Sequence, residues 1–142
     1  MLDGCTQLKS IDLSFLEDSK GLMFTSRMFR NCNSLKTVAF PKIRAFFLLE
    51  TDEMFSGCQH LESIDLSNIN TLSVSNMEKM FYGCKSLKEH DISNFNTRSL
   101  DNSDGIFDGI TNSKTVKIKY NETKTKERAE KIMDNWEKNE IY

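Results

Sequence analysis

Apolar and polar positions along the chain repeat with a period of 26 residues. The clearest marks of the repeat are apolar pairs that end in Phe: Met28-Phe29, Met54-Phe55, Met80-Phe81 and Ile106-Phe107. Four cysteines follow nearly the same spacing, with gaps of 27, 26 and 26 residues: Cys5, Cys32, Cys58 and Cys84. A fixed period in this range is the signature of a repeat protein, whose units bury their apolar sides against one another. We divide the chain into units that begin near residues 4, 31, 57, 83 and 109.

The first part of each unit alternates apolar and polar residues, which predicts a short strand with one buried face. The second part spaces its apolar residues differently: Val74, Met77, Met80 and Phe81 stand at i, i+3, i+6 and i+7. That spacing predicts a short helix with one buried face. The inward strand residues are expected to be Ile11 and Leu13, Val38 and Phe40, Ile64 and Leu66, His90 and Ile92, and Val116 and Ile118.

The end of the chain has a different pattern. Residues 124–139 are rich in Lys, Glu and Arg, and Ala129, Ile132, Met133 and Trp136 stand at helical spacing. This predicts an amphipathic helix that caps the last unit. The sequence thus predicts a solenoid over residues 1–120 and a helical cap over 121–142.

The repeat resembles the leucine-rich repeats of the BspA-like bacterial surface-protein family. The matching residues are Ile64-Asp65-Leu66-Ser67-Asn68, Asn76-Met77, Met80-Phe81-Tyr82-Gly83-Cys84 and Asp91-Ile92-Ser93-Asn94-Phe95-Asn96-Thr97. The second unit departs from the pattern at Ala39-Phe40-Pro41. The resemblance covers about residues 1–120. It implies an α/β, leucine-rich-repeat-like, right-handed solenoid of about five parallel strands with short helices on the other side, and a secreted or surface location.

Charge and hydropathy exclude three classes of protein. The 142 residues include 19 basic and 21 acidic side chains, for a net charge of −2. This balance excludes nucleic-acid binding or membrane-surface binding by bulk positive charge. No run reaches about 18 apolar residues, so no transmembrane span is expected. Met1-Leu2-Asp3-Gly4 lacks the layout of a signal peptide, which favours a cytoplasmic location if the chain is complete.

The cysteines permit two readings. Neighbouring cysteines one rung apart fall within the Cα separation that disulfides use. However, side chains in one row point the same way, which favours buried free thiols that serve as small core residues. The chain has no C-x-x-C pair and no His at ligand spacing, so no zinc site is expected.

Aspartates form another row, with Asp12, Asp65 and Asp91 at equivalent strand positions and Ala39 and Lys117 in the other units. Stacked carboxylates repel one another, and a cation such as calcium would relieve the repulsion. The alternative is that each aspartate accepts a hydrogen bond from the backbone of the following turn. Ala39 interrupts the row, which favours the second reading, and no metal or cofactor is expected.

Catalytic motifs are absent from the sequence. There is no glycine-rich phosphate loop, nucleophile elbow or H-E-x-x-H sequence. The two histidines are His60, expected in solvent before a strand, and His90, expected in an inward slot. Neither has a nucleophile or carboxylate placed beside it by the sequence, so we do not expect an enzyme.

Two groups of residues are candidates for contact with a partner: apolar residues at positions that are polar in later units, and residues of the outward sheet face. Met23, Phe24, Phe47 and Leu49 stand where later units carry polar residues, and they are expected to form an apolar patch or to be buried by a shifted register. Asp12, Asp65 and Asp91 belong to the other candidate surface, the outward sheet face. By alternation, that face consists of Ser10, Asp12, Ser14, Thr37, Ala39, Ser63, Asp65, Ser67, Glu89, Asp91, Ser93, Thr115 and Lys117.

These features favour a non-catalytic protein-binding module of a surface or adhesion-type repeat protein. The alternative is an intracellular stoichiometric inhibitor or immunity-type protein, which free thiols would suit. The expected partner is another protein. The first strand, about residues 8–14, is an unpaired edge, from which we also expect self-association.

Overall fold

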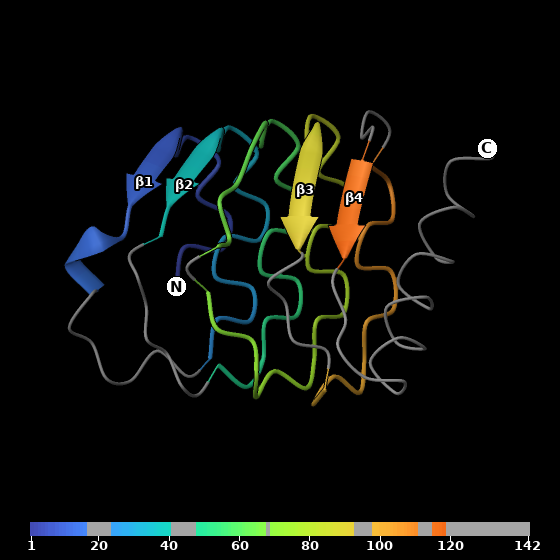
Figure 1. The fold of residues 1–142 in the computed structure, drawn as a ribbon. Helices are drawn as coiled ribbons and strands as arrows, with labels where there is room; N and C mark the ends of the chain where they lie inside the picture. The colour runs from blue at the N-terminus through green and yellow to red at the C-terminus, as the bar shows by residue number, and fades with distance from the viewer. Residues whose placement is uncertain (17–23, 41–47, 68, 93–97, 111–114, 119–142) are drawn as a thin grey trace.

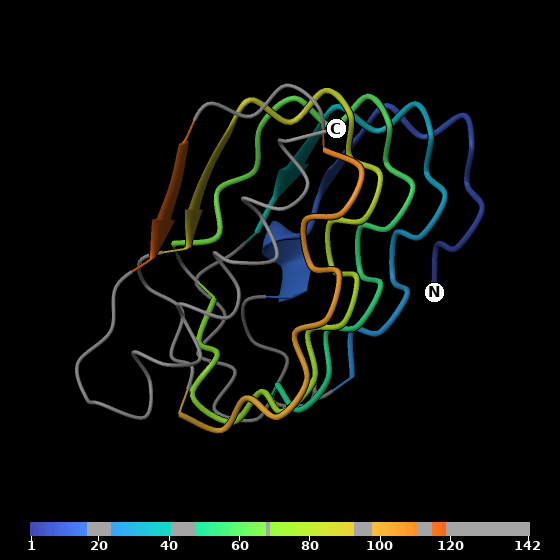
Figure 2. The ribbon, with the colours of Figure 1, turned by 90° about the vertical axis from the view of Figure 1, so that its right-hand side faces the viewer.

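The computed structural model describes residues 1–16, 24–40, 48–67, 69–92, 98–110 and 115–118. Within those ranges the chain forms a stack of similar coils, each lying against the next (Figures 1 and 2). The regular elements are short: β1 (Ser10–Asp12), the 3-10 helix η1 (Ser14–Leu16), β2 (Thr37–Ala39), β3 (Glu89–Ile92) and β4 (Thr115–Ile118).

The strands pair in parallel, β1 with β2 and β3 with β4. Asp12 pairs with Ala39, and Asp91 pairs with Lys117. These are the residues that the repeat alignment placed at equivalent positions, so the expected register is confirmed for both pairs. The two pairs form separate sheets.

The predicted fold class was wrong in its elements. The segment expected as the third strand, around Ile64 and Leu66, forms no strand, and the described residues hold four strands in two pairs rather than five in one sheet. Near this segment the coils are joined by longer hydrogen bonds, from Glu62 N–H to Lys36 O at 3.3 Å and from Lys88 N–H to Glu62 O at 3.4 Å. The predicted cap at 121–142 lies outside the described residues.

The predicted short helices are also absent: the described residues contain no α-helix, and tight turns occupy those segments. Two such turns occupy residues 77–84. Met80 N–H donates to Met77 O at 3.2 Å in the first turn, and Cys84 N–H donates to Phe81 O at 3.1 Å in the second. The first and last residues of each turn point inward, so Met77, Met80, Phe81 and Cys84 are all buried. Inward positions at i, i+3, i+4 and i+7 are the spacing of a helical face, which is why the sequence was misread.

Left-handed backbone at the third residue of each turn rules out a helix there. In the two turns of residues 77–84, these third residues are Lys79, with φ of 51°, and Gly83, with φ of 70°. A positive φ at this place is typical of a type II turn. The equivalent residues of the other coils are Gly4, Arg27, Asn31, Glu53, Gly57, Gly105 and Gly109, and each has a positive φ.

Within the turn segments, the backbone hydrogen bonds between coils all run in one direction. Phe29 N–H donates to Met54 O, Phe55 N–H to Met80 O, and Phe81 N–H to Ile106 O, each at 2.9 Å. In each segment of two consecutive turns, every second residue donates its N–H to the next coil in the same way. The N–H groups of the residues between these donors form hydrogen bonds that close the turns of their own coil. Each coil therefore donates to the next and accepts from the one before, as in a parallel ladder.

The core consists of rows that run along the stack. Phe29, Phe55, Phe81 and Phe107 are buried and stack in sequence, with ring centroids 5.4, 5.6 and 5.8 Å apart and interplanar angles of 10°, 3° and 8°. Phe40 contacts the edge of this row, at 6.1 Å from Phe55. Offset aromatic stacking adds to the free energy gained by burial.

We predict that Gly83→Ala lowers the free energy of unfolding by about 1 kcal/mol, because an L side chain is disfavoured at positive φ. A Cβ at Gly83 meets no atom within 4 Å, so this variant isolates the backbone term. Asn31→Gly, in the same row, is the matched control and should change stability little, because Gly and Asn both tolerate this conformation. Urea unfolding measures both; an unchanged midpoint for Gly83→Ala would contradict the turn assignment.

Candidate interaction surface

The predicted apolar patch is described in part. Phe24 is 60% exposed, Leu49 is half-buried, and Met23 and Phe47 lie outside the described residues. Leu48, beside Leu49, is buried. The described residues therefore place one aromatic side chain, Phe24, in solvent on this part of the surface.

Phe24 belongs to a row that crosses four coils. Parallel bridges join Phe24 to Glu50, Glu50 to Asn76, and Asn76 to Asn102. The other three members are polar, as expected for an outward position. Phe24 is thus an exposed aromatic residue in a row where the fold accepts polar side chains.

The aspartates of the sheet face form hydrogen bonds within their own coils. Asp12 Oδ1 accepts the Ser14 N–H at 2.8 Å, and Asp65 Oδ1 accepts the Ser67 N–H at 2.9 Å. This confirms the turn hydrogen bond that was weighed against a metal row. Hydrogen bonds from Ser14 lower the pKa of Asp12, and those from Ser67 lower the pKa of Asp65. Both side chains remain exposed, while the side chain of Asp91 lies outside the description.

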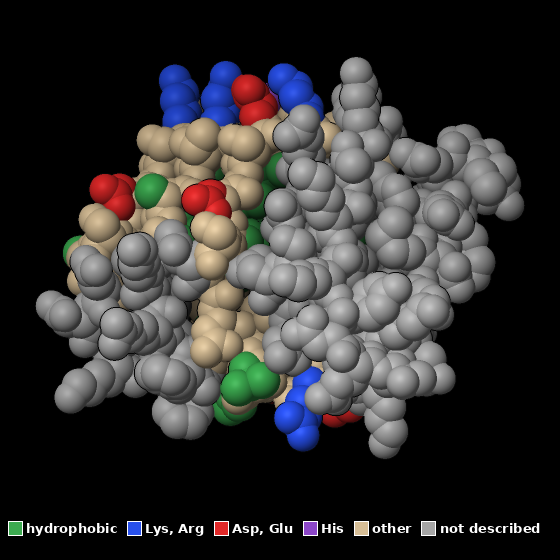
Figure 3. Space-filling view, viewed as in Figure 1, with side chains coloured by type: hydrophobic (Ala, Val, Ile, Leu, Met, Phe, Trp, Pro, Cys, Tyr) green, Lys and Arg blue, Asp and Glu red, His purple; other side chains and the backbone are tan. Residues whose placement is uncertain are grey.

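A charged row borders the sheet face where each strand segment begins. Lys9, Lys36, Glu62 and Lys88 are exposed and follow one another through backbone hydrogen bonds. Lys36 Nζ lies 3.5 Å from Glu62 Oε1. Figure 3 shows basic side chains with an acidic one among them along this edge.

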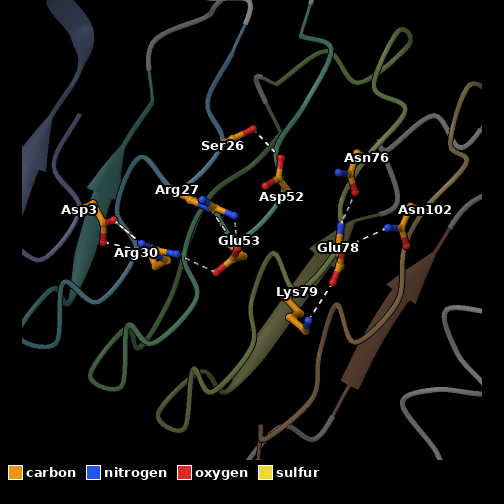
Figure 4. Close-up of polar contacts among 10 residues, drawn as sticks. All are labelled: Asp3, Ser26, Arg27, Arg30, Asp52, Glu53, Asn76, Glu78, Lys79 and Asn102. Carbon is orange, nitrogen blue, oxygen red and sulfur yellow. Dashed lines mark hydrogen bonds and ion pairs between the residues drawn. The ribbon is translucent and has the colours of Figure 1, made fainter.

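Ion pairs between coils form a network on the turn side (Figure 4). Arg30 donates to Asp3 on the preceding coil, with Nη2 2.7 Å from Oδ2, and its Nη1 lies 3.3 Å from Glu53 Oε2 on the next. Arg27 Nη2 reaches Glu53 Oε1 at 3.0 Å. The hydrogen bond from Arg30 lowers the pKa of Asp3. Opposite charges 26 residues apart (Arg27 and Glu53), 27 apart (Asp3 and Arg30) and 23 apart (Arg30 and Glu53) were the sequence signal for these pairs, and our sequence reasoning missed it.

A second polar group lies farther along the same side (Figure 4). Asn102 Nδ2 donates to Glu78 Oε2 at 3.1 Å, and Lys79 Nζ lies 2.8 Å from Glu78 Oε1. Asn76 Oδ1 accepts the Glu78 N–H at 3.0 Å. The hydrogen bond from Lys79 lowers the pKa of Glu78. The Glu78 carboxylate is thus held by neighbouring side chains of the fold, and these contacts order this part of the surface.

The cysteines are free thiols, and three of them are buried. Cys58 Sγ donates to Phe29 O at 3.1 Å, and Cys84 Sγ donates to Phe55 O at 3.2 Å, each one coil back. Burial raises the pKa of Cys58 to about 12 and raises the pKa values of Cys32 and Cys84. The reading as small core residues is confirmed for these three, whereas Cys5 is only partly buried.

The described residues offer little for catalysis. His60 is exposed, and its Nδ1 lies 2.6 Å from Asn33 O, while the side chain of His90 is not described. Within the described ranges, no three or more His, Cys, Asp or Glu side chains are grouped to hold a metal ion. Among the same residues, no helix is long and apolar enough to cross a membrane.

These features define a repeat protein built of stacked coils with a polar, partly charged surface. Residues 23–140 match the family described as "Mycoplasma protein of unknown function, DUF285", and the chain belongs to this family. Searches of curated proteins and of solved structures found no match.

We predict that iodoacetamide modifies Cys5 of the dilute native chain quickly and leaves Cys32, Cys58 and Cys84 intact, because a thiolate is the reactive form. Full modification in guanidinium is the control, and mass spectrometry counts the adducts.

The folded chain keeps the Cys58 proton to about pH 12, above the ordinary 9.0. Stability should therefore be full below pH 9.0 and fall as the pH rises toward 12. Rapid labelling of all four native thiols would contradict this burial.

Proposed function

We propose that the chain is a non-catalytic module that binds another protein, as part of a surface or adhesion-type repeat protein. The resemblance of its repeats to the BspA-like family motivates the second half of the proposal. The contact needs no cofactor. Binding would come from side chains held in rows on the outside of the stack.

The observation that carries the proposal is the exposure of Phe24. Its row continues through Glu50, Asn76 and Asn102, so folding does not require an aromatic residue there. Holding a large apolar side chain in water gains nothing for the isolated chain, whereas aromatic residues are enriched among those that dominate protein interfaces. Phe24 is therefore suited to anchor a partner, because it is an exposed aromatic residue at a position where the fold does not need one.

The rigidity of the surface supports the same proposal. Arg30, Glu53 and Glu78 are held by neighbouring coils, so their side chains lose less conformational freedom on binding than free ones would. The exposed face between the charged row and the aspartates consists of small residues such as Ser10, Thr37 and Ser63. A flat polar face with fixed charges at its margins fits a protein surface.

The free thiols were one of the features that favoured the intracellular inhibitor alternative, together with the small size of the chain. Cys32, Cys58 and Cys84 are buried, and burial raises their pKa values, which slows thiolate oxidation. These thiols therefore suit an oxidising compartment as well as a reducing one. The thiols no longer favour the alternative.

We predict that Phe24→Asn abolishes most partner binding without a change in melting temperature, since Asn occupies the same row in later coils. The immobilised chain would capture partners from a lysate of the source cells, with quantitative mass spectrometry as the readout. Leu72→Asn is the matched control, because Leu72 is also exposed, at 47%, but is not a member of the row that Phe24 begins. A partner should be retained by the wild type and by Leu72→Asn, and reduced about tenfold by Phe24→Asn.

Two results would count against the proposal. Equal capture by Phe24→Asn and the wild type would remove Phe24 from the binding surface. A large fall in the melting temperature of Phe24→Asn would show that the side chain stabilises the fold.

A further inference from the structure

The charged row that borders the sheet face consists of exposed side chains in fixed register: Lys9, Lys36, Glu62 and Lys88. Lys36 N–H donates to Lys9 O at 2.9 Å, and hydrogen bonds of 3.3 and 3.4 Å continue the row to Glu62 and Lys88. Backbone segments joined in this way lie about 5 Å apart from one coil to the next. The row is therefore a line of charges at regular spacing along one edge of the stack (Figure 3).

The fold balances only part of the charge in this row. Lys36 Nζ lies 3.5 Å from Glu62 Oε1, whereas in the described part of the chain Lys9 and Lys88 form no ion pair. Lys9 and Lys36 are neighbours in the row, and like charges at neighbouring positions of paired segments are destabilising. Three lysines and one glutamate give the row a net charge of +2, on a chain whose net charge is −2. An acidic ligand would relieve a repulsion that the fold leaves in place.

The rows on either side of the charged row offer hydrogen-bonding side chains: Gln7, Ser34, His60 and Ser86 before it, and Ser10, Thr37 and Ser63 after it. These described members include no Phe, Tyr, Trp or Arg. Single-stranded nucleic acids are bound by aromatic stacking beside basic groups, and arginine is the residue of choice for phosphate groups. Lysine ammonium groups flanked by hydroxyl and amide groups suit an acidic peptide instead, because its carboxylates and its backbone groups both find partners.

We propose that the charged row binds an acidic segment of a partner protein, which lies along the stack with its carboxylates on Lys9, Lys36 and Lys88. This proposal rests on the proposed function, that the chain binds another protein, and it names the chemistry of a contact separate from Phe24. Carboxylates placed on the row relieve the repulsion between Lys9 and Lys36. Glu62 limits the affinity, because it repels the acidic segment and already pairs with Lys36.

The test is fluorescence anisotropy of labelled decaglutamate titrated with the full chain, at low and at physiological salt. Lys9→Gln and Lys88→Gln should each raise the dissociation constant about threefold, the effect of one exposed charge pair, and salt should weaken binding. Glu62→Gln should lower the dissociation constant, because it frees Lys36. Lys79→Gln is the matched control: it changes the net charge equally but lies in a turn outside the charged row, so its binding should equal that of the wild type. Melting temperatures show that all four variants fold.

Three results would each overturn the proposal. Equal weakening by Lys9→Gln and Lys79→Gln would show that only net charge matters. Decaglutamine that binds as tightly as decaglutamate would remove the carboxylates from the contact. Heparin or oligothymidylate that binds more tightly than decaglutamate would assign the row to another class of polyanion. Phe24→Asn should bind decaglutamate like the wild type, because that peptide offers no apolar side chain, so a failure here is distinct from a failure of the partner-capture experiment.

Discussion

The structure depends on one interaction, the backbone hydrogen bond from a turn residue of one coil to the coil that follows. Phe55 N–H to Met80 O, at 2.9 Å, is an example. A ladder of such bonds fixes the rise per coil near the about 4.8 Å of paired strands. Equivalent side chains must therefore stack, which explains the rows of Phe rings, the thiols that donate one coil back, and the ion pairs of Arg30 with both neighbours.

The sequence predicted the period, the register of Asp12 with Ala39, and the burial of the Met-Phe pairs, because stacking imposes the same chemistry at the same place. The sequence pattern did not distinguish turns from helices, because two consecutive type II turns bury residues at i, i+3, i+4 and i+7, and a helix with one buried face has the same spacing. Gly83, just before Cys84, carried the missed signal, for glycine tolerates the positive φ of a turn. The strand predicted around Ile64 does not form, although the alternation of apolar and polar residues there is the same as in the segments that do form strands. Of the candidate contacts, Phe24 was correctly expected at the surface as one reading, whereas the pairing of Arg30 with Asp3 and Glu53 was missed.

A stack of this kind separates folding from recognition. The inward positions of each turn are fixed by the core, and Cys58 and Phe55 have almost no freedom to vary. The outward second and third positions, such as Glu78 and Lys79, are constrained only by the backbone and by their neighbours in the row. Binding properties can therefore change along the outside without loss of the ladder. Tyr82, at the second position of a turn, is an exposed aromatic side chain of this kind, and Phe24 is another exposed aromatic in the row just before the turns.

The most direct test of this account is measurement of scalar couplings across hydrogen bonds by NMR in the isotopically labelled chain. Such couplings identify the carbonyl that accepts each N–H. The account predicts a coupling from the Phe55 amide nitrogen to the Met80 carbonyl carbon and from Phe81 to Ile106. Couplings from Phe55 to Thr51 and from Phe81 to Met77 would indicate helices in these segments and would contradict it.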